Sequence, residues 1–441
     1  MLKLYDRIIF YDYKEIYEEL KPYIYEQKIK IEKSGNSPNP KYLTIDISNG
    51  NKIMEIDFDF SMEYFLYNYF YVEKVNDIVI SNYSINIDRV IFNKKVDFRY
   101  INFKNAISIE NVEFKSFVYF NNLKFKYLYI NKCLSETEWK FYNIEICQEL
   151  KLHLKPEETP LTIVLDNIKF KNEFSNLYIN LYHYEIDTLK ITNTTINGRI
   201  DLQNIKVNEV DFQGSIINGG LINSINFKVH KFANRESALF LKQQAYARNN
   251  AIDALEYKAK EIEKHKEDLI KDWQKNKDFK TFGDIVSIGL SSLYSDNGQN
   301  WIRAFICTIL FPTVFFTLSF APYTITLFIL IILCFAYPMF YNNNITKYIF
   351  CSLIAYLIIS FLYMFNDNSH LNFIKELFSF LTPTNFNQIV YNNENPSYIH
   401  SNNTSYIQLI FKGISYFIGK IAFWYGSVQT VTAFRKFAKG A

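Results

Sequence analysis

Cysteine, histidine and excess charge are all scarce in this sequence. Its 441 residues include five cysteines, none of them in a CxxC pair, and six histidines that share no ligand spacing. A disulfide framework and a metal site are therefore not expected, and the cysteines are interpreted as free thiols. The formal net charge of +3 gives no strong attraction to nucleic acid or to acidic partners.

Catalytic signatures are missing as well. The chain contains no GxGxxG, Walker loop, HExxH or GxSxG motif. We therefore expect a protein that is not an enzyme and that uses no cofactor. The polar start of the chain does not have the pattern of a signal peptide.

Long apolar segments, in contrast, are concentrated between residues 301 and 434. Three are nearly continuous, over residues 301–320, 322–340 and 348–365, and a more polar one follows over 406–434. The first three have 18 to 20 residues and the fourth has 29, and about 20 is the length at which an α-helix crosses a bilayer core. Because backbone groups in lipid must be satisfied internally, these segments predict a transmembrane domain with four helices.

The basic residues around these segments predict their orientation. Lys347 follows the second segment, and Arg435, Lys436 and Lys439 lie at the end of the chain. By the positive-inside rule both termini are expected in the cytoplasm of a multi-pass membrane protein.

A second pattern is a repeat of apolar residues at steps of five or six between residues 81 and 232. Its last members are Phe212, Ile217, Ile222 and Phe227. A period near five is typical of a square β-helix, in which each side of a coil turns one apolar residue into the core. Residues 134–184 interrupt the repeat and are interpreted as an inserted loop or irregular coils. An antiparallel β-sandwich of short strands is the alternative.

These patterns divide the chain into four regions of a multidomain α and β protein. Residues 1–80 form a mixed α/β cap, 81–232 the β-helix, 233–300 a helical connector with an interfacial segment, and 301–441 the transmembrane domain. The connector has a helical apolar stripe, which Asn249-Asn250 is expected to break into a hairpin.

Several of these segments resemble bacterial pentapeptide-repeat membrane proteins with a channel-like C-terminal region. The period of five resembles their sensor. Asn234-Arg235-Glu236 and Lys258-Ala259-Lys260-Glu261 resemble their junction helices, and Ser295-Asp296-Asn297-Gly298-Gln299-Asn300-Trp301 resembles the motif that leads into the membrane. The resemblance implies a cytoplasmic, right-handed pentapeptide-type β-helix that senses a ligand. It extends by analogy to Hailong-type anti-phage channel effectors, which implies a nucleotide or DNA-oligomer signal and a homo-oligomer, with a tetramer favoured.

Basic residues on successive coils and in the connector are the candidate phosphate contacts. They are Lys94, Lys95, Arg99, Lys126, Arg199 and Arg248. Residues one coil apart stack about 5 Å from each other, so a basic stripe could follow phosphates. The alternative is a solvated face that acidic side chains balance.

The fourth apolar segment carries polar residues that suit water better than lipid. The candidate pore-lining residues are Lys412, Lys420, Ser427, Gln429 and Thr430. An ionisable group in mid-membrane costs at least about 2.5 kcal/mol unless it faces water or a partner. We therefore expect the fourth helices of several subunits to surround a wet axis, with Gly413, Gly419 and Gly426 allowing close approach of helices. A lysine capped by a neighbouring carbonyl would indicate structural packing instead.

The sequence thus supports two functions. The first is a ligand-gated oligomeric ion channel, which the resemblance implies is an effector of anti-phage defence in the bacterial inner membrane. The alternative is a membrane-anchored β-helix scaffold that binds a protein partner and conducts no ions.

Overall fold

The computed structural model describes residues 7–34, 43–48, 52–70, 72–135, 138–154, 161–181, 185–320, 377–382 and 406–438. The chain divides into two compact units, Met1–Phe240 and Leu241–Ala441. The predicted helices at 322–340 and 348–365 lie outside the described residues.

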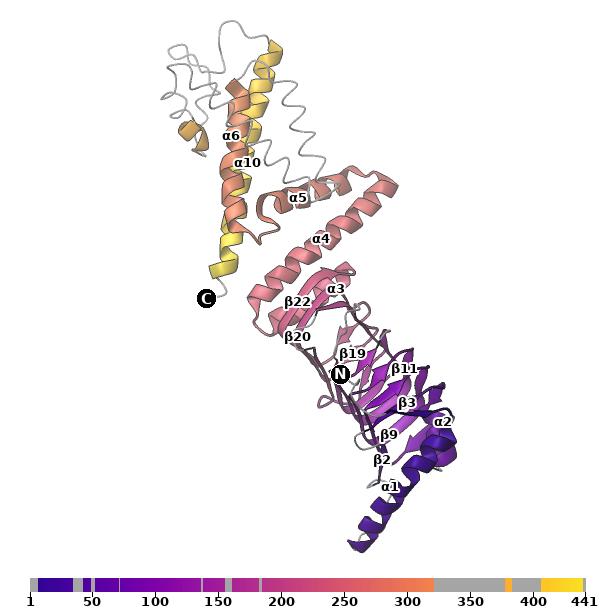
Figure 1. Cartoon of the computed structure of the whole chain (residues 1–441). Coiled ribbons are helices and arrows are strands. Elements are labelled where there is room, and N and C mark those ends of the chain that lie inside the picture. Colours follow the sequence, from indigo (N-terminus) through magenta and orange to yellow (C-terminus); the bar gives the residue numbers. More distant parts are fainter. Residues whose placement is uncertain are drawn as a thin grey trace. The chain divides into compact units, whose positions relative to one another are not determined.

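The first unit is a β-solenoid of about six turns, consistent with a pentapeptide-repeat-like β-helix. Its strands are stacked as a column of coils (Figure 1). The long strands are β9 (Val96–Glu110), β11 (Val118–Asn131), β14 (Glu145–His153), β18 (Glu185–Thr192), β20 (Arg199–Asp211) and β22 (Leu221–Phe232). Neighbouring coils pair in parallel, for example β9 with β11 and β11 with β14. This parallel pairing confirms the predicted β-helix and rules out the antiparallel sandwich.

Shorter strands complete the coils. They are β1 (Arg7–Phe10), β2 (Thr44–Ile47), β3 (Ile53–Ile56), β4 (Phe60–Ser61), β5 (Glu73–Val75), β6 (Ile78–Ser81), β7 (Ser84–Asp88), β8 (Val90–Phe92), β10 (Glu113–Phe114), β12 (Leu134–Ser135), β13 (Trp139–Tyr142), β15 (Thr162–Asp166), β16 (Lys169–Phe170), β17 (Asn176–Asn180), β19 (Thr195–Ile196) and β21 (Ile216–Ile217). Because β2, β3 and β4 pair in parallel with β7, β8 and β9, the coils begin well before residue 81.

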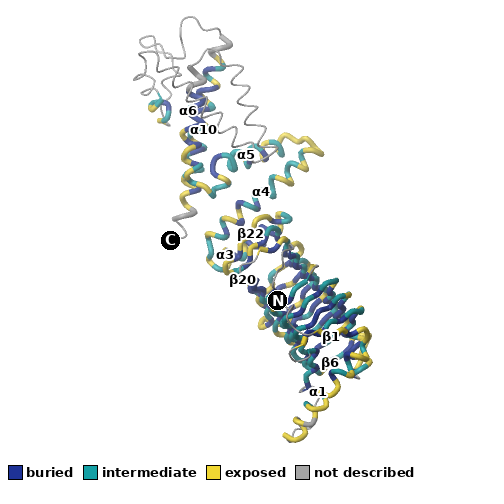
Figure 2. The backbone as a smooth tube through the Cα atoms, viewed as in Figure 1, coloured by how far each residue is buried: buried dark blue, intermediate teal, exposed yellow. Residues whose placement is uncertain are grey.

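Columns of apolar side chains form the interior of the solenoid. One column stacks Phe98, Phe120, Phe141, Leu165 and Ile191 from successive coils, and all five are buried. The rings of Phe98 and Phe120 are parallel, with centroids 4.9 Å apart. Figure 2 shows such buried positions recurring along the stacked strands.

The described part of residues 134–184 continues the solenoid, so its interpretation as an inserted loop is wrong, whereas the alternative of irregular coils agrees with the unequal coil lengths. Strands β12 to β17 lie in this range and pair in parallel with their neighbours. The chain takes 21 residues from Phe120 to Phe141, then 24 to Leu165 and 26 to Ile191. These longer coils shift the phase of the repeat, although the inward residues remain apolar.

Corners of the coils carry asparagine in the left-handed conformation. Asn122, Asn143, Asn167 and Asn193 have φ values of 51°, 54°, 54° and 51°. Asparagine tolerates this region better than most residues, since its side chain bonds locally. The Asn167 amide donates to Asn143 Oδ1 one coil away at 2.6 Å.

Helices cover the N-terminal end of the solenoid. Helix α1 (Tyr13–Lys33) buries Ile16 and Leu20, and α2 (Met62–Tyr69) buries Phe65 and Leu66. The Tyr13 hydroxyl donates to the Asp59 carbonyl. The Tyr13 ring also packs on Phe60 and Phe65, so an aromatic cluster covers the first coils.

The start of α3 (Arg235–Ala247) closes the last coil. Ser237 Oγ accepts from the Phe212 amide at 2.7 Å, and the Asn234 amide donates to Asp211 Oδ1 at 2.9 Å. The Phe240 ring stacks on that of Phe212. The Asn234-Arg235-Glu236 motif is thus part of a cap that satisfies polar groups at the end of β20.

The second unit is helical. It contains α4 (Ala251–Asn276), α5 (Phe279–Ser295), α6 (Trp301–Phe320) and α10 (Tyr406–Ala438). The break between α3 and α4 falls at Asn249-Asn250, as predicted, and the Asn250 side chain caps α4 by accepting from the Asp253 amide. Among the described residues, no helix combines the length and the apolar character needed to cross a membrane.

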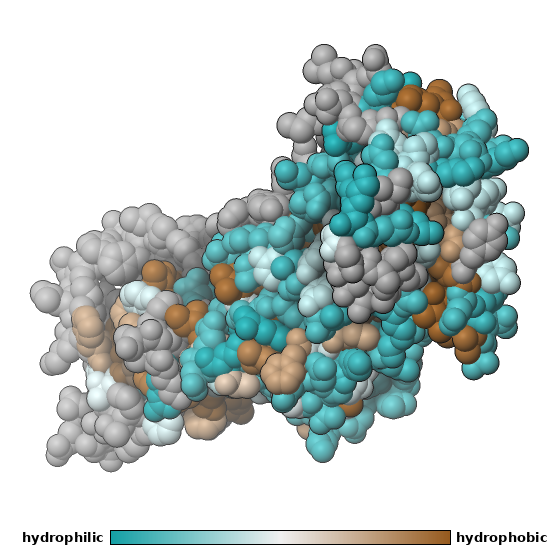
Figure 3. Space-filling view, turned by 90° about the horizontal axis from the view of Figure 1, so that it is seen from below, coloured by the Kyte–Doolittle hydropathy of each residue, from teal (hydrophilic) through white to brown (hydrophobic). Residues whose placement is uncertain are grey.

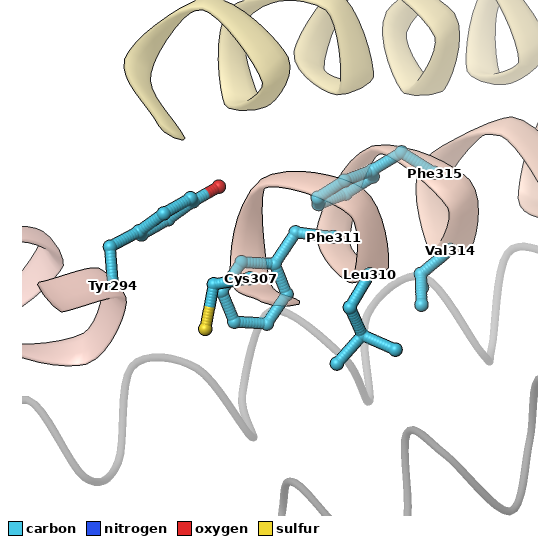
Figure 4. Packing of buried hydrophobic residues seen from close by; sticks show 6 residues of the cluster. All are labelled: Tyr294, Cys307, Leu310, Phe311, Val314 and Phe315. Carbon is cyan, nitrogen blue, oxygen red and sulfur yellow. The ribbon is translucent and has the colours of Figure 1, made fainter. Parts of the chain in front are cut away.

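An apolar cluster joins α5 to α6 in this unit. Buried Tyr294 from α5 meets Cys307, Phe311 and Val314 from α6, and residues of α10 pack against them. Figure 4 shows the Tyr294 side chain near Cys307 and Phe311, with Val314 farther along α6. Its hydroxyl donates to the Ala422 carbonyl of α10 at 3.2 Å.

Candidate functional site

The basic residues predicted to contact phosphate do not form one site. Lys94 is exposed at the corner before β9, and Lys95 lies over the Tyr119 ring, 4.9 Å from its centroid. Arg99 is paired with Asp97, its Nε lying 2.7 Å from Oδ1. The carboxylate of Asp97, which is buried, therefore neutralises the arginine in this group.

Arg199 is neutralised in the same way on another side of the coils. Its Nε donates to Asp201 Oδ1 at 2.8 Å. Arg199 stacks below Asn176 and Glu149, whereas Arg99 stacks with Asn121 and Tyr142. The two arginines thus belong to different ladders, and their charges do not add along one stripe.

The remaining two candidates are separate again. Lys126 is exposed and lies over the Tyr127 ring, 5.5 Å from its centroid. Arg248 follows α3, and its Nε donates to the Gln244 carbonyl at 3.4 Å. Of the predicted set, Lys94, Lys95 and Lys126 keep the charge most available to an outside phosphate. The assignment of a ligand to these residues stays a prediction.

A flat face of the solenoid, which the periodicity analysis overlooked, carries three tyrosines. We call it the tyrosine face and define it by Tyr127, Tyr129, Lys151, His153 and Tyr178. One column of outward side chains contains Tyr129 of β11, Lys151 of β14 and Tyr178 of β17. The residues that alternate with them along the strands, such as Leu128 and Leu150, point inward and are buried. Alternation of tyrosine with leucine or isoleucine along these strands was the sequence signal that could have found it.

Contacts within the tyrosine face order its side chains. Lys151 Nζ lies 5.3 Å from the Tyr129 ring centroid and 3.1 Å from Glu149 Oε2. The Tyr178 ring lies 5.2 Å from that of His153, and its hydroxyl donates to Gln203 Oε1 at 3.0 Å. Burial and the neighbouring Glu149 raise the pKa of Tyr129 to about 12, and burial beside Lys151 lowers the pKa of His153.

The residues predicted to line a pore take part in contacts inside one chain. Ser427 Oγ donates to the Phe423 carbonyl, and Gln429 Oε1 accepts from Ser295 Oγ at 2.9 Å. Thr430 Oγ1 lies 3.0 Å from Thr308 Oγ1 of α6. Pore lining stays a prediction, but these three side chains are engaged within the helical unit.

Lys420 is buried and capped by main-chain carbonyls. Its Nζ donates to the carbonyls of Phe380 and Thr382, at 2.7 Å for Thr382, and lies 4.9 Å from the Phe380 ring centroid. This is the arrangement expected of structural packing. Lys412 is also buried, yet its ammonium makes no hydrogen bond or ion pair with the residues that the structure describes.

Two of the three glycines in α10 permit close packing inside the chain. A Cβ on Gly426 would lie 2.6 Å from Thr308 Oγ1, and one on Gly419 would lie 2.9 Å from Phe315 Cβ. Gly413 has open space around it. At both Gly419 and Gly426, α6 of the same chain is a close neighbour. The predicted approach of helices from different subunits stays a prediction.

The outward side of α10 is apolar. Its exposed residues alternate at steps of four and three, and we call them the α10 stripe: Ile410, Ile414, Phe417, Ile421, Trp424, Val428 and Val431. Val428 retains 63% of its exposure and Ile410 60%. The helix thus turns polar groups inward and apolar groups outward, the reverse of a surface helix in water.

The Ser295 to Trp301 motif forms a tight elbow between α5 and α6. Asp296, Asn297 and Gly298 are consecutive left-handed residues. Gln299 Nε2 donates to the Leu255 carbonyl of α4 at 2.7 Å, while Ser295 bonds Gln429 of α10. The motif therefore ties four helices of the second unit together.

Neither a metal centre nor a disulfide is found in the part of the chain described. No group of three or more His, Cys, Asp or Glu side chains there is placed to hold a metal ion. Cys133, Cys147 and Cys307 are free thiols, as predicted. Cys334 and Cys351 lie outside the described residues.

These features define a β-solenoid protein with a second, helical unit. No known protein family, curated protein or solved structure matches the chain.

Proposed function

We propose that this chain is a membrane-anchored β-solenoid protein. The helical unit holds it in a lipid bilayer of the bacterial inner membrane, and the solenoid is the binding module in the cytoplasm. The supporting observation is the α10 stripe, because seven apolar side chains exposed on one helix are stable when lipid or another apolar surface covers them. Exposed apolar residues of α6, including Ile302, Phe305 and Ile309, add to this support.

Membrane extraction tests the anchor. The full chain, expressed in bacteria, should remain with the membranes in alkaline carbonate and float with added vesicles. A variant with Ile414, Ile421 and Val428 replaced by lysine should be released, since each charge in the hydrocarbon region costs about 2.5–3.5 kcal/mol. The matched control replaces Lys264, Lys271 and Lys275 of α4 by glutamine. A wild-type chain that carbonate releases completely would contradict the anchor.

A second candidate is a ligand-gated, homo-oligomeric ion channel, as in the resemblance to anti-phage effectors. Two observations favour it. The apolar residues of the α10 stripe recur at alternating steps of four and three, which is the spacing of the contact positions in a coiled coil between subunits. In addition, Lys412 is buried and has no partner among the residues that the structure describes. In this version several α10 helices associate, and a nucleotide or DNA-oligomer signal bound by exposed lysines such as Lys94 and Lys126 controls conduction.

Planar-bilayer recording separates the two candidates. A channel should conduct after addition of the signal, and Lys412→Glu should shift its preference from anions toward cations. The control Lys271→Glu should leave selectivity unchanged. If the protein stays in the membrane but conducts with none of the nucleotides or oligonucleotides tested, the channel is contradicted. The function is then that of an anchored scaffold that binds a protein partner.

A further inference from the structure

The turn between α4 and α5 carries three neighbouring aromatic rings, which we call the aromatic tip: Trp273, Phe279 and Phe282. Phe279 retains 86% of its exposure, the highest value among the large apolar side chains that the structure describes. Its ring centroid lies 6.4 Å from that of Phe282, which in turn lies 6.1 Å from that of Trp273. On the face shown in Figure 3, hydrophilic side chains prevail among the described residues and apolar ones form small patches, as is usual for a surface in water. An exposed ring that continues into two others therefore indicates a partner that covers it.

The turn holds these rings in a fixed position. Two residues separate α4 from α5, and the first of them, Lys277, has a left-handed φ of 46°. Its amide donates to the Trp273 carbonyl at 2.8 Å and closes the end of α4. The second, Asp278, caps α5 because its Oδ2 accepts from the Thr281 amide at 3.2 Å. Phe279 is thus the first residue of a capped helix and is presented by a tight turn.

Charges around the aromatic tip are mixed. Lys275, Lys277 and Lys280 are exposed and form no ion pair within the described part of the chain. Asp272 and Asp284 are exposed as well, so the local net charge is small and does not suit a polyanion such as nucleic acid. Lysines beside exposed aromatic rings are instead typical of a bilayer interface. There the rings enter the headgroup region, and the ammonium groups reach the phosphates on their flexible stems.

The other end of α5 is fixed against the α10 stripe. The Tyr294 hydroxyl donates to the Ala422 carbonyl, and Ser295 Oγ donates to Gln429. The same turns of α10 carry Val428 of the α10 stripe on their outward side. From this point α5 runs across the direction of α6 and α10 (Figure 1), and its 17 residues span about 25 Å. When the α10 stripe lies in lipid, α5 therefore carries the aromatic tip sideways from these two helices along the bilayer.

We propose that the aromatic tip inserts into the cytoplasmic leaflet of the bilayer that holds the helical unit. Phe279 enters the boundary between headgroups and acyl chains, and Trp273 and Phe282 lie at headgroup level. The three exposed lysines bond lipid phosphates. This inference rests on the proposed membrane anchor and adds a second lipid contact to it, at the junction between α4 and α5.

Photochemical cross-linking tests the insertion. The full chain carries p-benzoylphenylalanine at position 279, and bacterial membranes that contain it are washed with alkaline carbonate before irradiation. We expect phospholipid adducts of this residue in the mass spectrum. The matched control carries the same group at Phe174, a solenoid residue with 81% of its exposure, and should give at least about tenfold fewer adducts, because only an inserted residue meets acyl chains.

The failure of this inference can be told apart from the failure of the anchor. A chain that carbonate removes from the membranes contradicts the anchor, and the inserted tip with it. A chain that stays in the membranes but gives no lipid adduct at position 279 overturns the inserted tip alone. Adducts between two copies of the chain in place of lipid adducts would also overturn it, since the rings would then form a contact between subunits.

A second measurement tests the lysines. The chain with p-benzoylphenylalanine at position 279 is placed in nanodiscs that contain phosphatidylglycerol, and Lys275, Lys277 and Lys280 are replaced by glutamine. The adduct yield should fall at least about threefold, because each lysine near an acidic lipid surface contributes to attraction. The control variant replaces three exposed lysines of the solenoid by glutamine and should keep the yield: Lys206, Lys228 and Lys231. Equal yields in the two variants would overturn the phosphate contacts.

Discussion

The ammonium of Lys420 donates to the main-chain carbonyl of Thr382 at 2.7 Å. The same group bonds the Phe380 carbonyl and lies near the Phe380 and Tyr416 rings. A charge that seemed to require water around it is therefore satisfied by carbonyl oxygens at the end of the helical residues 377–381.

Replacing Lys420 by methionine should destabilise the helical unit. The change keeps an apolar stem but leaves two carbonyls without their donor, which costs about 1–3 kcal/mol. The measurement is the unfolding midpoint of the purified protein in detergent. Lys271→Met, at a lysine whose side chain is 69% exposed, is the control and should be neutral. Wild-type stability combined with altered conductance in Lys420→Met would instead place this lysine in a pore.

Alanine at Gly426 should loosen the contact between α10 and α6. The added Cβ would lie 2.9 Å from Thr308 Cα, so the helices must separate, at a cost of about 1–3 kcal/mol. Gly413→Ala is a matched control on the same helix, where the Cβ meets open space. It should be neutral or stabilising by up to about 1 kcal/mol, because alanine favours helix. Equal effects at the two positions in thermal unfolding would contradict the packing described here.

The corner at Asn167 should tolerate glycine better than alanine. Its φ of 54° strains an ordinary side chain by about 1–2 kcal/mol, whereas glycine adopts it freely. Both variants lose the hydrogen bond to Asn143, so their difference isolates the backbone effect. Urea denaturation followed by circular dichroism measures it, with Asn208→Ala, outside the left-handed corners, as the control. A glycine variant less stable than the alanine variant would disprove the argument.

Glu55 should make the solenoid less stable in acid. The Asn93 amide, which donates to Oε1 at 2.7 Å, and then Arg7 lower the pKa of this carboxyl. Its contribution is therefore complete above the ordinary value of about 4.3 and is lost as the pH falls through the lower folded value. Glu55→Gln should be less stable than wild type by under about 1 kcal/mol at neutral pH. That gap should close below about pH 4 in urea titrations; a constant gap would contradict the assignment.

Local patterns predicted the main elements well. The apolar segment at 301–320 matches α6, and the segment beginning at residue 406 matches the start of α10. The period of five indicated the coils because each side of a coil must bury one residue whatever its neighbours are. At 134–184 the sequence left an inserted loop and irregular coils open, because coil length can vary without changing the apolar character of the inward residues.

The site was harder to predict than the fold. Arg99 and Arg199 are basic in the sequence, yet Asp97 and Asp201 neutralise them in the structure. Tyr129 and Tyr178 are separated by 49 positions and meet in one column only because intervening coils stack in register. Such neighbours depend on the lengths of all the corners between them.

Sequence alone determined where the chain forms coils and where α6 and α10 lie, since periodicity and apolar runs are local properties of the chain. Only the tertiary structure decided what the polar groups of α10 face. Thr430 contacts Thr308 of α6, and Gln429 accepts a hydrogen bond from Ser295 of α5. Lys420 donates to the carbonyl of Thr382. A side chain's electrostatic role is set by the atoms within a few ångströms of it, and those come from distant parts of the sequence.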